Sequence, residues 1–325
     1  MKLSVLETEE FRHLINYFNF KPAKSSFEFV ISCSNNLGPL TTLIVGHDNA
    51  GITPKWMIEC IFVRNEITGH IHKFPCGRWL GKGVDDDSLE RLLIAEPVTH
   101  NEVYDLPNIQ LLSPYGSSPR SRSPTILRGT TSDEKKLPAP AIQEMLGNSI
   151  NTLVKFFEKA DSERGNLTSL MCGEHGLVSS VESIFTFGYK SYKLLKRLYV
   201  WDFLEKSVNE FESQMYAHSK YSSNVNTSKH FVMEKFISVI KTINSTSSNY
   251  GKDGKFQIFV CLACRDSFMA EWFSLLSESN TATQMYDEFS FLRNYELNKF
   301  GVKILSITSQ FNFKLENSLT MGINF

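Results

Sequence analysis

The pattern of apolar and polar residues divides the chain into two regions with different periods. Between residues 27 and 96, apolar residues alternate with polar neighbours, as at Phe27, Phe29 and Ile31, or form short runs rich in β-branched residues. Two such runs are Leu40 to Val45 and Trp56 to Val63. Turn sequences rich in Asn, Asp and Gly separate them, so we expect short antiparallel strands. Their spacing is typical of a β-sandwich or a barrel.

Beyond residue 140 the apolar positions follow the helical period instead. One stripe runs from Ile142 to Phe157, a second from Leu177 to Phe185 and a third from Phe236 to Ile243. A fourth begins near residue 256 and continues to 276, and a fifth covers residues 285–292. Clusters of Asn, Ser, Thr and Gly separate the stripes. This pattern predicts an all-helical bundle over residues 141–325.

Two further segments fit neither region. Residues 97–140 hold seven of the eleven prolines and a Ser/Arg-rich stretch, a composition that predicts an extended or disordered linker. Its Ser-Pro pairs beside Arg120 and Arg122 are candidate phosphorylation sites, although such pairs are common in linkers. Residues 1–25 show helical spacing from Phe11 to Phe18 before Pro22 stops it. We therefore expect a short amphipathic helix there, which has no counterpart in a sandwich.

Length, charge and cysteine content exclude several classes of function. A chain of 325 residues is long enough for about two domains. Its net charge of -1 provides no overall field that would attract nucleic acid. Six cysteines scattered over a chain with a sizeable core argue against a disulfide framework. The N-terminus lacks a signal peptide and no apolar run is long enough to cross a membrane, so we expect a cytoplasmic protein with peripheral membrane contact.

No motif supplies the residues that catalysis or a cofactor requires, so we expect no enzyme site, metal or cofactor. The stretch Gly251 to Phe256 has the wrong spacing for a P-loop and lacks its hydroxyl, which indicates a turn that leads into a helix. Cys261 and Cys264 form a C-x-x-C pair inside an apolar helical stretch, with no second pair at zinc-finger spacing. This context favours two thiols packed in a core over a metal or redox site.

Two other groups of potential ligands are incomplete. His70 and His72 project from one face of a predicted strand without a third ligand. The run Asp85-Asp86-Asp87 has the carboxylates that calcium prefers, but a solvated surface turn is the simpler interpretation. Neither group therefore predicts a metal site.

One cluster of cations indicates a partner. In a helix predicted from Tyr189 to Leu204, the apolar residues share one face and four cations gather on another. The cations are Lys190, Lys193, Lys196 and Arg197. On a nearly neutral chain they form a local positive patch. This patch is either a solvated helix face or a surface for an acidic protein partner or an anionic membrane.

Motifs in the strand region resemble a PLAT domain. In order, they are Ile44 to Gly51, Lys55-Trp56, Val63 to Gly69 and Lys73 to Leu80. The resemblance implies an antiparallel β-sandwich that touches lipid or a second protein. Trp56 and Trp79 are candidate contact residues, although large aromatic residues in strands also commonly belong to a core. Because residues 1–25 do not match the opening strands of such a sandwich, we expect those strands to be missing.

Motifs in the helical region resemble a RUN domain. They are Leu170 to Leu177, Val200 to Glu205 and Gly251 to Phe256. A PLAT domain followed by a RUN domain is similar to the C-terminal part of the class-five DENN domain-containing proteins, which are exchange factors and effectors of Rab GTPases.

This resemblance implies an adaptor in vesicle trafficking on Golgi or endosomal membranes, which binds a Rab-type GTPase in its GTP form. The DENN module that carries guanine-nucleotide exchange is absent from the sequence, so no exchange activity is implied. An alternative is a peripheral lipid-binding module, in which the four cations or the two tryptophans contact an anionic membrane.

Overall fold

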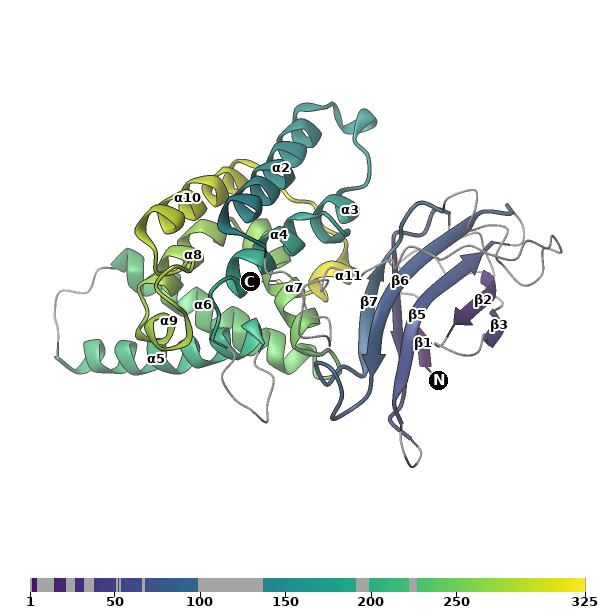
Figure 1. Ribbon diagram of the computed structural model, residues 1–325, viewed down its shortest axis with the longest axis horizontal. Helices are drawn as coiled ribbons and strands as arrows, with labels where there is room; N and C mark the ends of the chain where they lie inside the picture. The colour runs from purple at the N-terminus through teal and green to yellow at the C-terminus, as the bar shows by residue number, and fades with distance from the viewer. Residues whose placement is uncertain are drawn as a thin grey trace. The chain divides into compact units, whose positions relative to one another are not determined.

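The chain folds into two compact units, Met1–Ile126 and Leu127–Phe325. The structure, a computed structural model, describes residues 2–4, 15–21, 27–31, 38–50, 52, 54–65, 68–98, 137–190, 199–221 and 227–324. Strands make up the first unit and helices the second, as Figure 1 shows. Most of the predicted linker and its Ser-Pro pairs lie outside the described residues, so both remain predictions.

The first unit is an antiparallel β-sandwich, as predicted. One sheet has the strand order β1-β4-β7 and the other β3-β2-β5-β6, and every neighbouring pair is antiparallel. The strands are β1 (Lys2–Ser4), β2 (Ile15–Lys21), β3 (Phe27–Ile31), β4 (Thr42–Gly46), β5 (Trp56–Arg64), β6 (Ile71–Leu80) and β7 (Glu90–Ile94). The predicted runs at residues 40–45 and 56–63 thus correspond to β4 and β5.

The core of the sandwich is formed by apolar residues of β4 to β7. They are Leu43, Val45, Ile58, Ile61, Val63, Phe74, Cys76, Leu80 and Leu93. A register shift between Ile58 and Cys60 interrupts the pairing of β5 with β6. Because of this bulge, Ile58 and Ile61 both face the core, whereas three residues along a regular strand would place them on opposite faces.

The N-terminal segment corrects two expectations. β1 pairs with β4, and β2 pairs with both β3 and β5, so residues 1–25 do contribute strands to the sandwich. The helix expected from Phe11 to Phe18 is wrong over the described part, since Ile15 begins β2. Phe18 and Phe20 show the period of two that a strand requires, and they pair with Val63 and Ile61 of β5. Sheet pairing over a long distance in sequence therefore overrides a weak local pattern.

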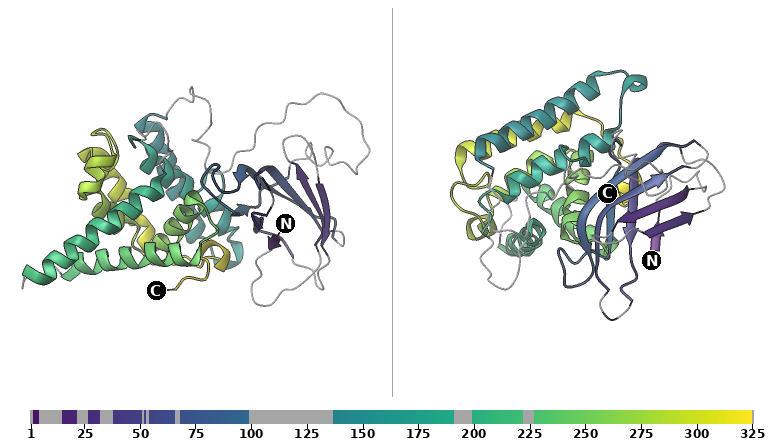
Figure 2. Two further views of the ribbon diagram at one scale, coloured as in Figure 1. Left: turned by 90° about the horizontal axis from the view of Figure 1, so that it is seen from below. Right: turned by 45° about the vertical axis from the view of Figure 1, so that its right-hand side comes forward.

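The regular elements that the structure describes in the second unit are helices, which confirms the predicted bundle. Its helices are α2 (Ala139–Glu158), α3 (Leu167–Cys172), α4 (Leu177–Thr186), α5 (Val200–Tyr221), α6 (Thr227–Thr246), α7 (Lys252–Arg265), α8 (Met269–Ser277), α9 (Asn280–Met285), α10 (Tyr295–Leu305) and α11 (Asn317–Thr320). Two short 3-10 turns, η1 (Asp161–Glu163) and η2 (Ser306–Gln310), connect them. Figure 2 shows the two long helices α5 and α6 side by side.

Helix α7 forms the centre of this unit. It contacts α4, α5, α6, α8 and α11, and every residue from Ile258 to Cys264 is buried. A helix surrounded in this way is apolar on all sides and shows little amphipathic pattern. Gly251 is its N-terminal cap and Lys252 to Phe256 already belong to the helix. The stretch Gly251 to Phe256 is therefore the start of α7 itself, and not a turn before a helix as expected.

The thiols in α7 are core residues, as the sequence indicated. Cys261 and Cys264 have no exposed surface, and the Sγ atom of Cys261 lies 3.6 Å from that of Cys172 at the end of α3. The contact with Cys261 and burial together raise the pKa of the Cys172 thiol well above its ordinary value. Burial likewise raises the pKa of Cys264. Thiols in this environment are neutral and chemically inert.

Two predicted helices have different boundaries in the structure. The stripe from residue 256 to 276 is two helices, α7 and α8, because Ser267 adopts a left-handed conformation with φ of 63° between them. The stripe over residues 285–292 is mostly a loop, since α9 ends at Met285 and Asn294 caps the start of α10 by accepting from Leu297 N–H. In both cases a turn or a helix cap, and not the spacing of apolar residues, determines where the helix ends or begins.

Candidate protein-binding surface

One of the four predicted cations, Lys190, lies in the described part of the chain. Lys193, Lys196 and Arg197 belong to residues 191–198, which lie outside the described residues. The helix expected from Tyr189 is wrong at its start, because Tyr189 pairs with Tyr286 in an antiparallel bridge and α5 begins only at Val200.

Gly188 is the local reason for this change of direction. Its φ of +73° is left-handed and ends α4, a conformation that glycine adopts without strain. A Cβ atom here would also come within 2.7 Å of the Cβ of Ser290, so only glycine allows the two segments to approach so closely.

Main-chain hydrogen bonds hold this bridge in place. Lys190 N–H donates to the carbonyl of Met285 at 2.9 Å, and Asp287 N–H donates to the carbonyl of Gly188 at 2.8 Å. The hydroxyl of Tyr189 donates to the carbonyl of Tyr199 at 3.0 Å, which joins the described residues on either side of the basic segment. The start and end of that segment are therefore fixed beside the bridge.

Aromatic side chains cluster next to Lys190. Phe289 exposes 56% of its surface, and its ring lies 5.6 Å from the ring of the partly exposed Phe187 at a steep angle. Phe187 in turn packs on Phe291, which is completely buried. We refer to Phe187, Tyr189 and Phe289 as the aromatic patch. An exposed aromatic ring that is supported by buried rings is typical of an anchor residue in a protein interface.

The charges at the edge of the aromatic patch are weakly engaged. Lys190 Nζ lies 3.8 Å from the Asp287 carboxylate, and both side chains are partly exposed. Such a pair contributes only about 0–1 kcal/mol in solvent and can exchange partners. Glu288 next to it is largely exposed and lies 3.6 Å from Arg293. The surface therefore combines aromatic rings that pack on buried residues with charged side chains that are free to pair with a partner.

Sequence reasoning found the cation at this surface but missed the aromatic rings. The apolar spacing over residues 285–292 predicts a helix, which would turn Phe289 towards the core. The available signal was the sequence Phe187-Gly188-Tyr189, in which a glycine between two aromatic residues marks a turn after a helix.

The two tryptophans of the PLAT-like region have different environments. Trp56 is partly buried against the sandwich core, and its ring lies 5.2 Å from that of His47. Trp79 on β6 remains 44% exposed. Ile52, in the loop that leads into β5, is fully exposed and was not singled out from the sequence. Trp79 and Ile52, but not Trp56, are therefore available to a partner.

The aspartate run corrects another expectation, because two of its carboxylates are not solvated. The side chain of Asp86 has no exposed surface and forms an ion pair with Arg91, while the side chain of Asp85 is 9% exposed and pairs with Arg78. Arg91 also lies 3.6 Å from Asp85 and donates to the carbonyl of Trp79 at 3.3 Å. Two guanidinium groups thus neutralise the carboxylates that a calcium ion would need.

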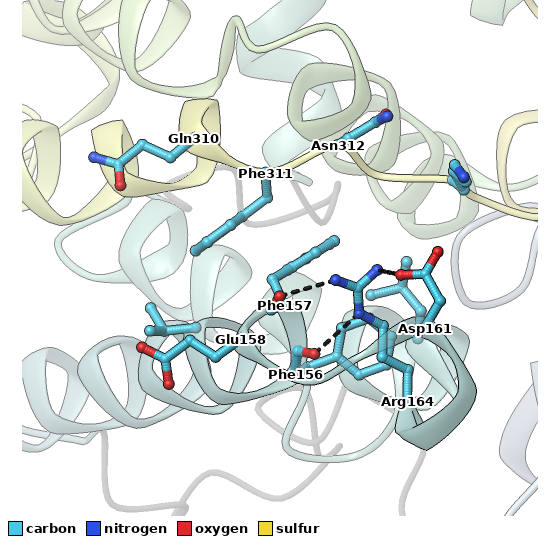
Figure 3. A pocket seen from close by; sticks show the side chains of 11 residues that line it. Phe156, Phe157, Glu158, Asp161, Arg164, Gln310, Phe311 and Asn312 are labelled. Atoms are coloured by element: carbon cyan, nitrogen blue, oxygen red, sulfur yellow. Dashed lines mark hydrogen bonds and ion pairs between the residues drawn. The ribbon is translucent and has the colours of Figure 1, made fainter.

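An open hollow of about 850 Å³ lies at the C-terminal end of α2 (Figure 3). Arg164 closes the helix end by donating to the carbonyls of Phe156 at 3.2 Å and Phe157 at 2.8 Å, and it pairs with Asp161. The rings of Phe157 and Phe311 stack 4.7 Å apart and are nearly parallel. This hollow is not predictable from the sequence, because its walls are formed by residues 154–167 and 310–314, which are far apart along the chain.

Within the ranges that the structure describes, no group of three His, Cys, Asp or Glu side chains is arranged to bind a metal ion. His70 and His72 stand next to each other at the start of β6, and burial together with the charge of His70 lowers the pKa of His72. Among the described helices, none has both the length and the apolar composition needed to span a membrane.

Family models match both regions of the chain. The PLAT/LH2 domain model matches residues 6–93, and the RUN domain model matches residues 171–319. The chain therefore contains a PLAT/LH2 domain and a RUN domain, consistent with the sandwich and the helical unit. The aromatic patch and the hollow at the end of α2 both belong to the helical unit.

Curated proteins match over short lengths. Mouse "Lipoxygenase homology domain-containing protein 1" is 38% identical over 68 residues, which is 21% of this chain and 3% of that protein. Human "Polycystin-1-like protein 3" is 30% identical over 89 residues, or 26% of this chain and 5% of that protein. Mouse "Polycystin family receptor for egg jelly" is 36% identical over 64 residues, or 20% and 3%. The chain thus matches only a small part of the length of these relatives.

Proposed function

We propose that this chain is a non-enzymatic binding protein that recognises a small GTPase through the aromatic patch of its RUN domain. The observation that carries the proposal is the exposed ring of Phe289, which is supported by Phe187 and lies two residues after Asp287, the ion-pair partner of Lys190. RUN domains commonly interact with small GTPases, and PLAT domains mediate contacts with membranes and lipids. A rigid aromatic anchor with charges at its rim suits a folded protein partner.

The basic segment supports the same surface. Lys193 is three residues from Lys190, and Arg197 is two residues from Tyr199. These cations are thus close in sequence to the described residues Lys190 and Tyr199, which flank the basic segment. Cations beside an apolar anchor speed the encounter with an acidic partner. The switch segments of a GTPase change with the bound nucleotide, so their recognition makes binding nucleotide-dependent.

The finer part of the proposal is a Rab-type GTPase in its GTP form and a role as an adaptor in vesicle trafficking at Golgi or endosomal membranes. It rests on the resemblance of the PLAT and RUN motifs, in this order, to the class-five DENN domain-containing proteins. We propose no exchange activity. Addition of the purified chain to a GDP-loaded GTPase should accordingly leave the rate of nucleotide release unchanged.

Binding to a panel of Rab-type and Rap-type GTPases, each loaded with GDP or a non-hydrolysable GTP analogue, tests the proposal. We expect at least one partner that prefers the GTP analogue by tenfold or more. Phe289→Ala should weaken that binding at least tenfold, because anchor residues carry most of the binding energy. The matched control is Tyr216→Ala, which removes another exposed aromatic ring, on α5, and should change affinity less than twofold. Equal effects of the two variants would refute the aromatic patch as the site.

A second function, peripheral binding of lipid by the PLAT domain, is favoured by the exposed Ile52 and Trp79. Ile52 precedes β5 and Trp79 lies near the end of β6, and these two strand ends are paired through Trp56 and Leu80. A fully exposed apolar side chain in a loop, three residues from the exposed Lys55, suits insertion into an anionic membrane.

Sedimentation with vesicles of phosphatidylcholine containing one third phosphatidylserine tests this second function. We expect binding that Ile52→Asp abolishes and that Phe289→Ala leaves intact. Unchanged sedimentation of the Ile52→Asp variant would exclude this loop as a membrane contact. The two functions can therefore be tested independently in the same chain.

A further inference from the structure

The chain segment that follows η2 has unpaired main-chain groups. Phe311 leaves η2 in an extended conformation, with φ of -106° and ψ of 140°. Among the described residues, the N–H and C=O groups of Asn312 to Leu315 have no hydrogen-bond partner. Asn312 and Lys314 are exposed while Phe313 between them is 3% exposed, which is the alternation of a strand. The segment is not paired as a strand, but it shows the alternation and the unpaired main chain of an isolated strand edge, and we refer to residues 312–315 as the strand edge.

This strand edge forms one wall of the hollow at the end of α2. Phe311 reaches from the segment towards Phe157 on the helix, and the two rings stack, as Figure 3 shows. Phe313 packs edge-on against Phe157 with ring centroids 5.2 Å apart and fixes the segment to the helix. Val154 and Leu167 add apolar surface to the lining. A groove with an apolar floor therefore runs along an unpaired backbone.

The charged side chains along the groove differ in whether they are already paired with other groups of the chain. The Arg164 guanidinium is already engaged by Asp161 and by two carbonyls at the end of α2. Lys314 is exposed and, within the part of the chain described, has no ion-pair partner. The free cation on the side of the strand edge is thus Lys314, whereas the exposed Glu158 lies on the helix side of the groove.

We propose that this groove binds an extended peptide segment of a partner protein by adding it as a strand to residues 312–315. Free main-chain groups favour an extended ligand, because another strand satisfies donors and acceptors in alternation. An aromatic or branched apolar side chain of the peptide packs against Phe157 and Phe311, and a neighbouring carboxylate pairs with Lys314. The groove and the aromatic patch share no residue, so this inference does not depend on the GTPase proposal.

Selection of random twelve-residue peptides displayed on phage, with the full chain as bait, tests the proposal. We expect enriched peptides that carry an apolar residue close to Asp or Glu. The best peptide, synthesised with a fluorescent label, should lose at least tenfold in affinity to the Lys314→Glu and Phe311→Ala variants. Lys303→Glu, an equivalent reversal at an exposed site on α10, should change affinity less than twofold. No enrichment, or equal loss with both lysine variants, would overturn the proposal.

A second measurement distinguishes an added strand from other modes of binding and does not need the Phe311 variant to fold. N-methylation of single peptide amides should weaken binding tenfold or more at every second position and have little effect between them. Hydrogen exchange of the amides of residues 312–315 should slow when the peptide is bound. A helical bound peptide, or a tolerance of N-methylation throughout, would contradict strand addition. Dimerisation of the free chain that Phe311→Ala abolishes would instead assign the groove to a second copy.

Discussion

Replacing Arg91 by methionine should strongly destabilise the PLAT domain. The substitution keeps an unbranched side chain but removes the guanidinium that pairs with Asp86, whose carboxylate has no exposed surface. Removal of one partner of a buried ion pair costs about 3–5 kcal/mol, because the other charge stays buried without compensation. Arg78 still lies 3.9 Å from Asp86 and provides weak compensation, so we expect a loss near the lower end, about 3 kcal/mol.

Hydrogen exchange followed by mass spectrometry measures this loss in the full chain. Under conditions where exchange reports the equilibrium population of the open state, about 3 kcal/mol corresponds to roughly 100-fold faster exchange of the peptides that cover β5 and β6. The control is Lys82→Met in the loop that holds Asp86. Its ammonium group is exposed and, among the described residues, donates only to the carbonyl of Asp87 at 3.1 Å. It should change stability by less than about 0.5 kcal/mol.

A third variant separates the charge from the shape of the side chain. Adding Asp86→Asn to Arg91→Met removes the uncompensated charge and should recover at least about half of the loss. If the hydrogen exchange rate of the Arg91→Met variant stays within threefold of the wild-type rate, the buried ion pair does not stabilise the domain as we infer. This result would show that the aspartates are hydrated in solution rather than held by the two arginines.

Three further predictions concern the helical unit. Gly301→Ala should lower the free energy of unfolding by about 1–2 kcal/mol, because a Cβ atom there would come within 2.7 Å of a buried phenylalanine ring. Gly147→Ala has open space around the new Cβ atom and should raise the free energy of unfolding by about 0.5–1 kcal/mol. Thermal unfolding followed at 222 nm should move in opposite directions for the two variants. Burial favours a raised pKa for Glu210, but hydrogen bonds from the first turn of α9 outweigh it and lower that pKa. The ionised carboxylate of Glu210 therefore stabilises the fold above its ordinary pKa of about 4.3, and this stabilisation is lost as the pH falls through the lowered pKa. The Glu210→Gln variant has no carboxylate to titrate. Its free energy of unfolding in urea should therefore vary less with pH between about 3 and 5 than that of the wild type. Cys172 and Cys261 should resist iodoacetamide in the folded chain and react with it once the chain is unfolded. Peptide mass spectrometry measures the labelling of each thiol. Rapid labelling of either thiol in the native state would contradict their buried environment.

The sequence alone was sufficient for features that depend on local patterns. Alternating residues and polar turns predicted the strands that became β3 to β6, and apolar stripes predicted α2, α4 and α6, because one face of each element must be buried whatever its neighbours are. The inert C-x-x-C pair was also predictable, since an uninterrupted apolar stretch around Cys261 and Cys264 leaves no room for a ligand set. The motifs that resemble PLAT and RUN domains agree with the two family models.

Only the tertiary structure decided which residues form surfaces and sites. β2 exists because β3 and β5 provide partners on both of its edges, and a short segment holds no record of such distant pairing. Asp86, in the loop between β6 and β7, is buried because that loop folds back so that Arg91 on β7 and Arg78 on β6 both reach it. Phe289 is exposed because Gly188 brings two loops together, and Phe311 borders a groove because it meets Phe157 from the far end of the RUN domain. In each case the environment of a side chain is set by how other segments fold against it, which the periodicity of a single segment does not reveal.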